Sequence, residues 1–332
     1  MSTLNTTNIK HTANTGDPNL VLDTAGNVVI NGDAQMQSQN SGPLAGLRNV
    51  LINPGMEISQ RYGLNNLQTT ANDFAVDRWR CVDGTNYSQQ NSTNNWADGF
   101  SKHVLINTTG TATLYQHVEL PYAGCPAPFG QGTTWTLSGY FAGNGSSIDV
   151  QPWVVFTDGL NGTGNQSTVF FPAATTIDSP TSKLVRAEWT FDVGVDPNPS
   201  NTSLSVFFIC TNTGGSASIS GCQLEPGPVA TPLEIRPIGM ELGMCQRYYS
   251  RQDKMRIVGY QVAGQEIAHS VKCSMRANPT ATTSNFSLAN VANGAQPIPT
   301  NFESTGGSLR IVAGGAGTVS AIDGVLVLDA EL

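Results

Sequence analysis

Residues 221–249 read GCQLEPGPVATPLEIRPIGMELGMCQRYY and join an extended, proline-rich stretch to a short helical one. Four prolines lie between residues 226 and 237, and each fixes φ at about −65° and removes a backbone donor. This stretch, which we call the strap (residues 226–237), therefore cannot be a regular helix or a central strand. The apolar residues after Pro237 predict a short amphipathic helix that docks on the sandwich or on a threefold-related subunit.

The docking contacts of this helix are expected to come from its apolar and basic side chains. Gly243 inside the helix costs roughly 1 kcal/mol relative to alanine, so packing must hold the helix in place. A cation near the helix end complements the macrodipole. The predicted docking residues are Leu242, Cys245, Arg247, Tyr248 and Tyr249.

The sequence before the strap predicts many short strands. Apolar or alternating runs are separated by turns rich in Gly, Asn and Pro, a pattern typical of a sandwich. The clearest runs are 112–119, 133–141, 149–156, 184–193, 204–210 and 217–224. We therefore predict a mostly β protein with a jelly-roll-like β-sandwich over residues 47–234.

Residues 235–332 are expected to form the docking helix and a small C-terminal β domain. Strand-like runs occur at 255–262, 268–273, 280–288, 309–313 and 325–330. Residues 291–307, VANGAQPIPTNFESTGG, are expected to form a loop between two of them. No period of 20–50 residues repeats, which excludes a solenoid or a propeller.

Residues 1–46 are predicted to be a separate N-terminal arm. Two short apolar runs in residues 19–30 flank the turn sequence DTAGN and predict a hairpin. An isolated hairpin is marginally stable in water, so we expect it to pair with other subunits or with a larger particle. Its anchoring side chains would be Leu20, Leu22, Val28 and Ile30.

The composition of the chain excludes some classes of binding partner. Charged residues make up 12 % of the sequence and the net charge is −8, which argues against nucleic acid because phosphate binding needs clustered Lys and Arg. No apolar segment indicates a signal peptide or a membrane span. The six cysteines lack CxxC spacing, so we expect buried free thiols.

Several motifs together resemble a family of bacteriophage virion proteins described as tail fibre, tail collar or particle-surface proteins. They are LRNVLINPGMEISQR (47–61), FAVDRWR (74–80), the QLEPGPVATPLEIRP…CQRYY stretch (223–249), MRANPTA (275–281) and LDAEL (328–332). The resemblance implies a structural protein of the virion, made in the host cytoplasm and without enzymatic activity. It also implies other virion proteins as partners, a homotrimer, and a contribution to host attachment. A capsid decoration or head fibre protein, or a polysaccharide-degrading tail protein, remains an alternative.

Sequence motifs typical of catalytic or metal-binding sites are nearly absent, and we predict no cofactor and no metal site. His103 and His117 flank a predicted strand pair, which allows them to meet in space, but no metal-ligand spacing supports a site. Asp77, within the DRW motif, is expected to be structural, paired with Arg78 or Arg80 or capping a turn.

A glycan site is the remaining binding hypothesis, because sugars stack on aromatic rings and bond to amides and carboxylates. The polar segment YSQQNSTNNWADGF (87–100) offers the best combination of these groups. The candidate residues are Tyr87, Asn94, Asn95, Trp96, Asp98 and, in a second loop, Tyr122. Packing under a loop or a subunit contact is the alternative role. Trp79, Trp135 and Trp189 are predicted to be core residues, and the role of Trp153 is left open.

Overall fold

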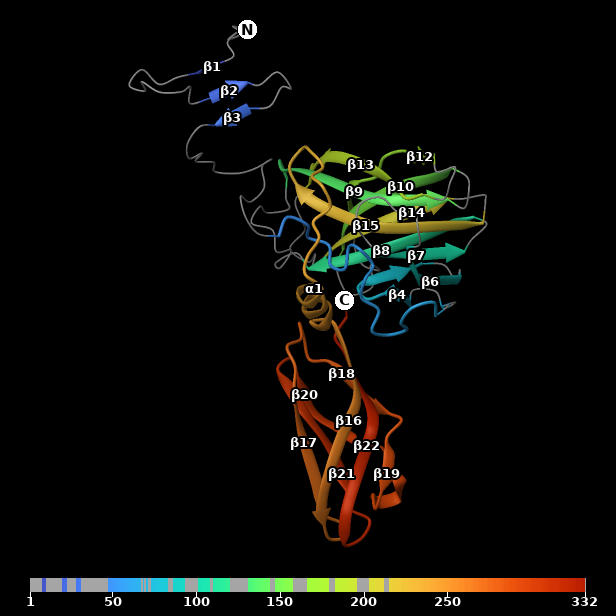
Figure 1. Cartoon of the computed structure of the whole chain (residues 1–332), viewed down its shortest axis with the longest axis vertical. Helices are drawn as coiled ribbons and strands as arrows, with labels where there is room; N and C mark the ends of the chain where they lie inside the picture. The colour runs from blue at the N-terminus through green and yellow to red at the C-terminus, as the bar shows by residue number, and fades with distance from the viewer. Residues whose placement is uncertain are drawn as a thin grey trace.

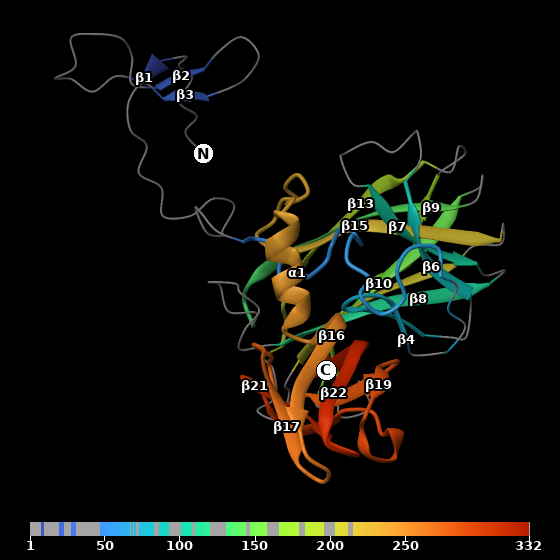
Figure 2. The same cartoon turned by 60° about the horizontal axis from the view of Figure 1, so that its bottom comes forward.

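The computed structural model describes residues 47–66, 68, 70, 73–82, 86–92, 101–107, 110–119, 131–143, 147–157, 166–178, 183–195, 203–211 and 215–331, together with the backbone of 8–9, 20–22 and 28–30. Two β domains follow one another along the long axis, with the strap and helix α1 (Ile238–Gln246) between them (Figure 1). The C-terminus lies at the same junction, as Figures 1 and 2 both show.

The first domain is a sandwich of two antiparallel sheets. The larger sheet has the order β11-β10-β14-β8-β5-β4, with β12 beside β10, and the smaller sheet has the order β13-β9-β15-β7-β6. The strands are β4 (Asp73–Val76), β5 (Trp79–Cys81), β6 (Asn86–Asn91), β7 (Lys102–Asn107), β8 (Thr111–Glu119), β9 (Thr134–Gly143), β10 (Ile148–Thr157), β11 (Gln166–Phe170), β12 (Thr175–Ile177), β13 (Val185–Asp192), β14 (Ser203–Thr211) and β15 (Ser216–Pro226). The predicted sandwich is confirmed, and all six predicted strands are present within about two residues of their expected ends.

Alternation along the strands explains where the core lies. In most strands one face turns between the two sheets and is buried, because side chains alternate between the two faces of a strand. The buried residues include Trp79, Trp135, Leu137, Phe141, Phe156 and Phe208, and Trp189 packs against them. Three of the four tryptophans in the described part of the sandwich are therefore core residues, as predicted, and Trp153 alone lies outside this cluster.

The second domain, residues 249–331, also consists of two antiparallel sheets. One has the order β16-β22-β18, with β19 beside β22, and the other has the order β17-β21-β20. The strands are β16 (Tyr249–Gln261), β17 (Glu266–Lys272), β18 (Thr280–Ser284), β19 (Ser287–Ala289), β20 (Ile298–Glu303), β21 (Gly306–Val312) and β22 (Gly317–Asp329). Its own core contains Ile257, Val271, Leu309, Ile311, Val319, Leu326 and Leu328.

Strand β20 corrects one prediction, because it lies in residues 291–307, which were expected to be a loop. This segment contains prolines at 297 and 299, which remove two backbone donors. However, β20 pairs only with β21 and forms the edge of its sheet. Proline is tolerated on an edge strand, because the missing N–H has no partner to lose.

The N-terminal hairpin is present as predicted. Strand β2 (Leu20–Leu22) pairs antiparallel with β3 (Val28–Ile30), with Leu20 opposite Ile30, and β1 (Asn8–Ile9) adds a third strand. Nothing in the structure describes the side chains of Leu20, Leu22, Val28 and Ile30, so their anchoring role stays a prediction.

Candidate functional site

The junction between the two domains brings together side chains from five separate motifs. Although they are far apart in sequence, residues of the 47–61, 74–80, 245–249, 275–281 and 328–332 segments contact one another there. The participating side chains are Gln60, Arg61, Asp77, Arg78, Arg247, Tyr248, Tyr249, Arg276, Asp329 and Glu331. We call this set the junction cluster.

Arg78 is its central residue. It lies in the turn between β4 and β5 with a φ of 73°, and it is 3 % exposed. Its guanidinium lies 3.5 Å from the centroid of the Tyr248 ring, forms an ion pair with Glu331 and donates to the main-chain oxygen of His117. One side chain thus ties the sandwich to the end of α1 and to the C-terminal segment. A planar guanidinium suits this arrangement because it stacks and donates at once.

Arg61 makes a second stack of the same kind. Its guanidinium carbon lies 3.9 Å from the Phe74 ring centroid and 3.6 Å from that of Tyr249. The same group forms ion pairs with Asp329 at 3.2 Å and Glu331 at 3.5 Å. Because Glu331 bonds to both Arg61 and Arg78, the C-terminal segment holds the two stacks together.

Glu119, at the end of β8, forms the other half of the junction. It pairs with Arg247 at 2.8 Å and with Arg276. Burial raises the pKa of Glu119, but the hydrogen bonds from the two arginines outweigh it and hold the pKa below its usual value. Arg276 also donates to the main-chain oxygen of Ala330 at 3.2 Å.

The predicted docking residues lie at this junction, with one correction. Cys245, Tyr248 and Tyr249 are buried and Arg247 pairs with Glu119, whereas Leu242 is only half-buried. The buried residues of α1 are Glu241 and Cys245, so the helix lacks the predicted apolar stripe. Glu241 turns inward because the main-chain N–H of Asn53 and the guanidinium of Arg236 bind its carboxylate.

Asp77 is structural, but its predicted arginine partners are wrong. Its carboxylate accepts from the main-chain N–H of Gln60 at 3.0 Å and from the Gln60 side-chain amide at 2.6 Å. The same amide donates to the main-chain oxygen of Tyr249 at 2.9 Å. Burial raises the pKa of Asp77 above its usual value, although the Gln60 hydrogen bond and the charge of Arg61 each act to lower the pKa.

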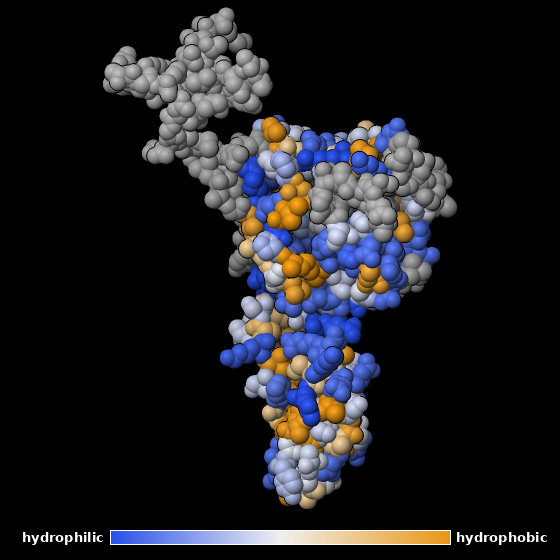
Figure 3. Space-filling model, viewed as in Figure 1, coloured by the Kyte–Doolittle hydropathy of each residue, from blue (hydrophilic) through white to orange (hydrophobic). Residues whose placement is uncertain are grey.

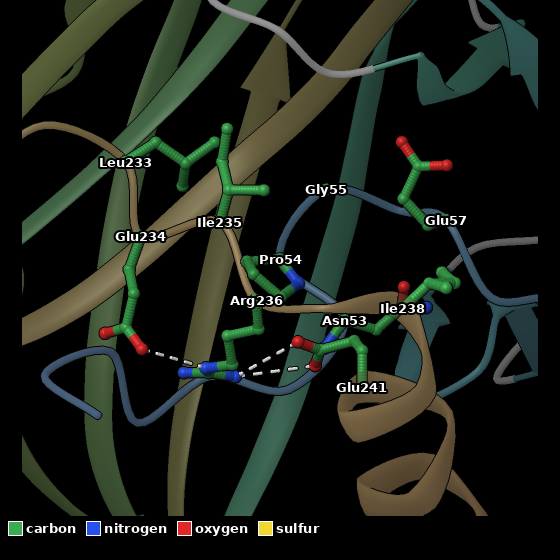
Figure 4. A pocket seen from close by; sticks show the side chains of 10 residues that line it. All are labelled: Asn53, Pro54, Gly55, Glu57, Leu233, Glu234, Ile235, Arg236, Ile238 and Glu241. Atoms are coloured by element: carbon green, nitrogen blue, oxygen red, sulfur yellow. Dashed lines mark hydrogen bonds and ion pairs between the residues drawn. The ribbon is translucent and has the colours of Figure 1, made fainter. Parts of the chain in front are cut away.

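The strap is held against the sandwich by a second buried network. Arg236 donates to the main-chain oxygens of Leu51, at 3.0 Å, and Asn49. It also pairs with Glu234 at 3.1 Å and with Glu241 at 3.3 Å, as the dashed lines of Figure 4 show. The glutamate and arginine of the ATPLEIRP sequence are therefore partners of each other.

Two further glutamate contacts fix the ends of the strap. Glu225 accepts from the main-chain N–H of Thr231 at 2.8 Å and pairs with Arg48 at 3.1 Å. Glu234 accepts from the main-chain N–H groups of Arg48, at 2.7 Å, and Asn49, at 2.8 Å. These contacts give residues 47–49 a defined place beside the strap.

A shallow open pocket lies between the strap and residues 53–57. Figure 4 shows Leu233, Ile235 and Ile238 around it, with the Arg236–Glu241 pair below. The large apolar side chains exposed along the strap and the first turn of α1 are those of Val229, Ile235, Ile238 and Met240. We call these four residues the strap patch, and Figure 3 shows hydrophobic residues gathered over this part of the molecule.

The predicted glycan-binding residues are mostly outside the described residues, and the one that is described is corrected. Tyr87 is 0 % exposed in β6, and its hydroxyl donates to the main-chain oxygen of Thr70 at 2.7 Å. A ring buried in the core cannot stack on a sugar. Asn94, Asn95, Trp96, Asp98 and Tyr122 lie outside the described residues.

His103 in β7 and His117 in β8 do not contact each other. His103 alternates with the core residues of β7 in the smaller sheet, and His117 alternates with those of β8 in the larger sheet, so they lie on opposite outer faces. Their Nδ1 atoms face different serine hydroxyls, Ser92 at 3.3 Å and Ser205 at 2.6 Å. Within the described residues, no three His, Cys, Asp or Glu side chains are grouped so as to hold a metal ion.

Acidification is expected to destabilise the sandwich through these two histidines. Burial lowers the pKa of His103 from 6.5 to about 4 and, with the nearby Arg80 and Arg78, lowers that of His117 to about 3. Below pH 6.5 the unfolded chain therefore binds more protons than the native one. Stability falls with pH by up to about 1.4 kcal/mol per pH unit for each histidine, until the native histidine itself protonates.

Urea unfolding at pH 7, 6.5, 6, 5.5 and 5 would measure this loss of stability. A His117→Gln variant should retain about half of the pH dependence, since one of the two titrating groups remains. An unchanged slope in that variant would contradict the assignment.

Comparison with known proteins does not identify a family. No protein-family model matches the chain, and no curated protein sequence matches it. No helix of the described part is long and apolar enough to cross a membrane.

Solved structures share only a distant similarity with this chain. The enzymatically active domain of tailspike protein 4 from bacteriophage CBA120 aligns with a TM-score of 0.32 and 14 % identity, over 48 % of this chain and 21 % of that one. The xylan-binding CBM22-1 domain of Paenibacillus barcinonensis Xyn10C has a TM-score of 0.35 and 15 % identity, over 58 % of this chain and 100 % of that one. A cyclase from Fischerella sp. TAU has a TM-score of 0.39 and 13 % identity, over 56 % and 100 %. At these TM-scores and identities, the similarities establish neither a family nor a function.

Proposed function

We propose that this protein is a structural component of a bacteriophage virion, a tail fibre or tail-associated surface protein that contributes to host attachment and has no enzymatic activity. The observation that carries the proposal is the position of the motifs that resemble such proteins. Their arginine, tyrosine and carboxylate side chains form the junction cluster and the strap network, where they fix two β domains to each other.

A rigid junction is what an attachment protein on the outside of a particle needs. A flexible linker would let the second domain reorient, whereas stacked guanidinium groups with buried ion pairs define one geometry. The proposed partners are other virion proteins, contacted through residues 1–46, and a glycan on the host cell surface. The proposed function involves neither binding to nucleic acid nor insertion into a membrane.

Labelling of purified virions tests this function directly. Antibodies against the chain, conjugated to gold, should decorate the tail in electron micrographs of particles from a producing lysate. Label on the capsid would instead favour a decoration or head fibre protein. Absence of the chain from purified particles, with the protein present in the lysate, would overturn the proposal.

We also propose that the chain assembles as a homotrimer and that the strap patch lies in the subunit contact. Exposed apolar patches on soluble proteins mark interaction sites, and Ile235 and Ile238 are 68 % and 58 % exposed. Light scattering should give three times the chain mass for the wild type and a lower mass for Ile235→Asp. The control is Val258→Asp, because Val258 is an apolar residue that is 47 % exposed on β16 of the second domain. A trimer in the Ile235→Asp variant would exclude the strap patch from the contact.

A further inference from the structure

The outer face of the larger sandwich sheet carries an aromatic row that the core does not use. Trp153 in β10 lies opposite Phe207 in β14, which lies opposite Tyr115 in β8. The ring centroids are 4.9 Å apart at both steps, and the rings are stacked. Just beyond β11, Phe171 packs edge-on against Trp153 at 5.9 Å and is 52 % exposed. The row therefore becomes accessible at its Trp153–Phe171 end.

A polar row crosses the same face. Thr176, Asp149, Thr211 and Thr111 lie opposite one another on β12, β10, β14 and β8, and all four are exposed. The Thr176 hydroxyl donates to the Asp149 carboxylate at 2.6 Å, and the Thr111 and Thr211 hydroxyls are 3.1 Å apart. Asp149 and Trp153 are four residues apart on one strand, so the polar and aromatic rows lie on the same face and are separated by about 13 Å.

The residues between the two rows complete a continuous surface. Gln151, Ile209 and Thr113 lie opposite one another in register and are half-buried. The Gln151 amide donates to the main-chain oxygen of Pro172 at 2.7 Å, which positions the segment that carries Phe171. An aromatic edge, an amide and a strip of hydroxyl and carboxylate groups thus share one face of the sheet.

This combination matches the chemistry of a sugar chain. A pyranose has an apolar C–H face that stacks on an aromatic ring and hydroxyl groups that both donate and accept. A carboxylate accepts from such hydroxyls, and threonine hydroxyls can do either. The single charged group of the two rows, Asp149, is an anion, and the whole chain has a net charge of −8. A neutral sugar chain therefore fits better than an acidic one.

We infer that the outer face of the larger sheet is a glycan-binding site for a neutral pyranose oligosaccharide, with Phe171 and Trp153 against a sugar face and Asp149 and Thr211 bonded to its hydroxyls. The inference deepens the proposed function, on which it rests for the source of the glycan at the host surface. These residues are accessible to solvent, whereas Tyr87, the earlier candidate for contact with a glycan, is buried.

Titration of the full chain with three soluble hexasaccharides, of β-1,4-linked xylose, glucose and galactose, tests the site. Saturation-transfer NMR and calorimetry should detect binding of at least one of them to the wild type. Phe171→Ala and Asp149→Ala should each weaken that binding at least tenfold. The matched control is Tyr260→Ala, because Tyr260 is an aromatic residue that is 76 % exposed on the second domain. This variant should bind the oligosaccharide with the affinity of the wild type. Circular dichroism would show that each variant is folded.

The outcomes separate this site from the wider proposal. Wild-type affinity in both Phe171→Ala and Asp149→Ala would overturn the sheet-face site. Loss of binding in Trp96→Ala alone would place the glycan site in residues 87–100 and keep the glycan role. Absence of binding by all three probes would overturn the inference, while virion labelling would still decide the structural role.

Discussion

Replacing Arg236 with alanine is expected to lower the free energy of unfolding of the sandwich by about 3–5 kcal/mol. The side chain is almost completely buried and bonds to two carboxylates and two main-chain oxygens. Its removal would leave Glu241 buried without a cation and the oxygens of Asn49 and Leu51 without a donor. An uncompensated buried charge costs more than the lost contact itself.

Tryptophan fluorescence is the suitable measurement, because all five tryptophans precede the strap and none lies in the second domain. Urea unfolding followed in this way reports the sandwich alone. Glu188→Ala is the matched control, since Glu188 forms an exposed ion pair with Arg186 at 3.2 Å on β13 of the sandwich, and such pairs contribute about 1 kcal/mol or less. An Arg236→Ala effect no larger than that of the control would show that the strap is not held by its buried charges.

The strands and the helix could be predicted because their signals are local. Alternating apolar residues located the six principal strands of the sandwich, and the prolines of the strap located the start of α1 at Ile238. The end of the helix was predicted too late, since Tyr248 and Tyr249 were expected on the helix, whereas α1 ends at Gln246 and β16 begins at Tyr249. Local pattern is sufficient when the burial of a residue follows from its neighbours in sequence.

The roles of buried polar residues could not be predicted, because their partners are distant in sequence. Glu241 is turned inward by Asn53, which is 188 residues away. In β6 the sequence NYSQQN reads as a polar loop, yet Tyr87 is buried and Gln89 donates to the main-chain oxygen of Met56 at 2.6 Å. Hydrogen bonds of this kind satisfy polar groups inside a protein, and composition alone cannot reveal them.

The junction cluster shows the same limit at the scale of domains. The motif sequences were recognisable one by one, but nothing in them indicated that Arg61 and Arg78 would share Glu331. The aromatic row of the outer sheet face was also hidden, because Trp153, Phe207 and Tyr115 become neighbours only through strand register. Register depends on the whole sheet and is not a property of any one strand.

Replacing Arg78 with alanine is expected to have two effects, a loss of about 3–5 kcal/mol in the stability of the sandwich and a loss of fixed domain orientation. The first follows because Arg78 is buried and donates to the main-chain oxygen of His117. The second follows because the same guanidinium stacks on Tyr248 and pairs with Glu331, which belong to the connection and to the C-terminal segment. Small-angle scattering of the full chain would show the second effect as a broader distribution of interatomic distances.

The variants Arg78→Lys and Arg310→Ala distinguish the causes. Lysine keeps the charge but neither the planar stack nor the fork of donors, so we expect it to recover only part of the stability and of the domain orientation. Arg310 forms an exposed pair with Glu266 at 2.7 Å inside the second domain, and its loss should leave both measurements unchanged. If Arg78→Ala kept the scattering profile of the wild type, the remaining contacts of Arg61 and Glu119 would be sufficient to fix the two domains. If Arg78→Lys behaved like the wild type in both measurements, charge alone would fix the junction and the stacking on Tyr248 would contribute little.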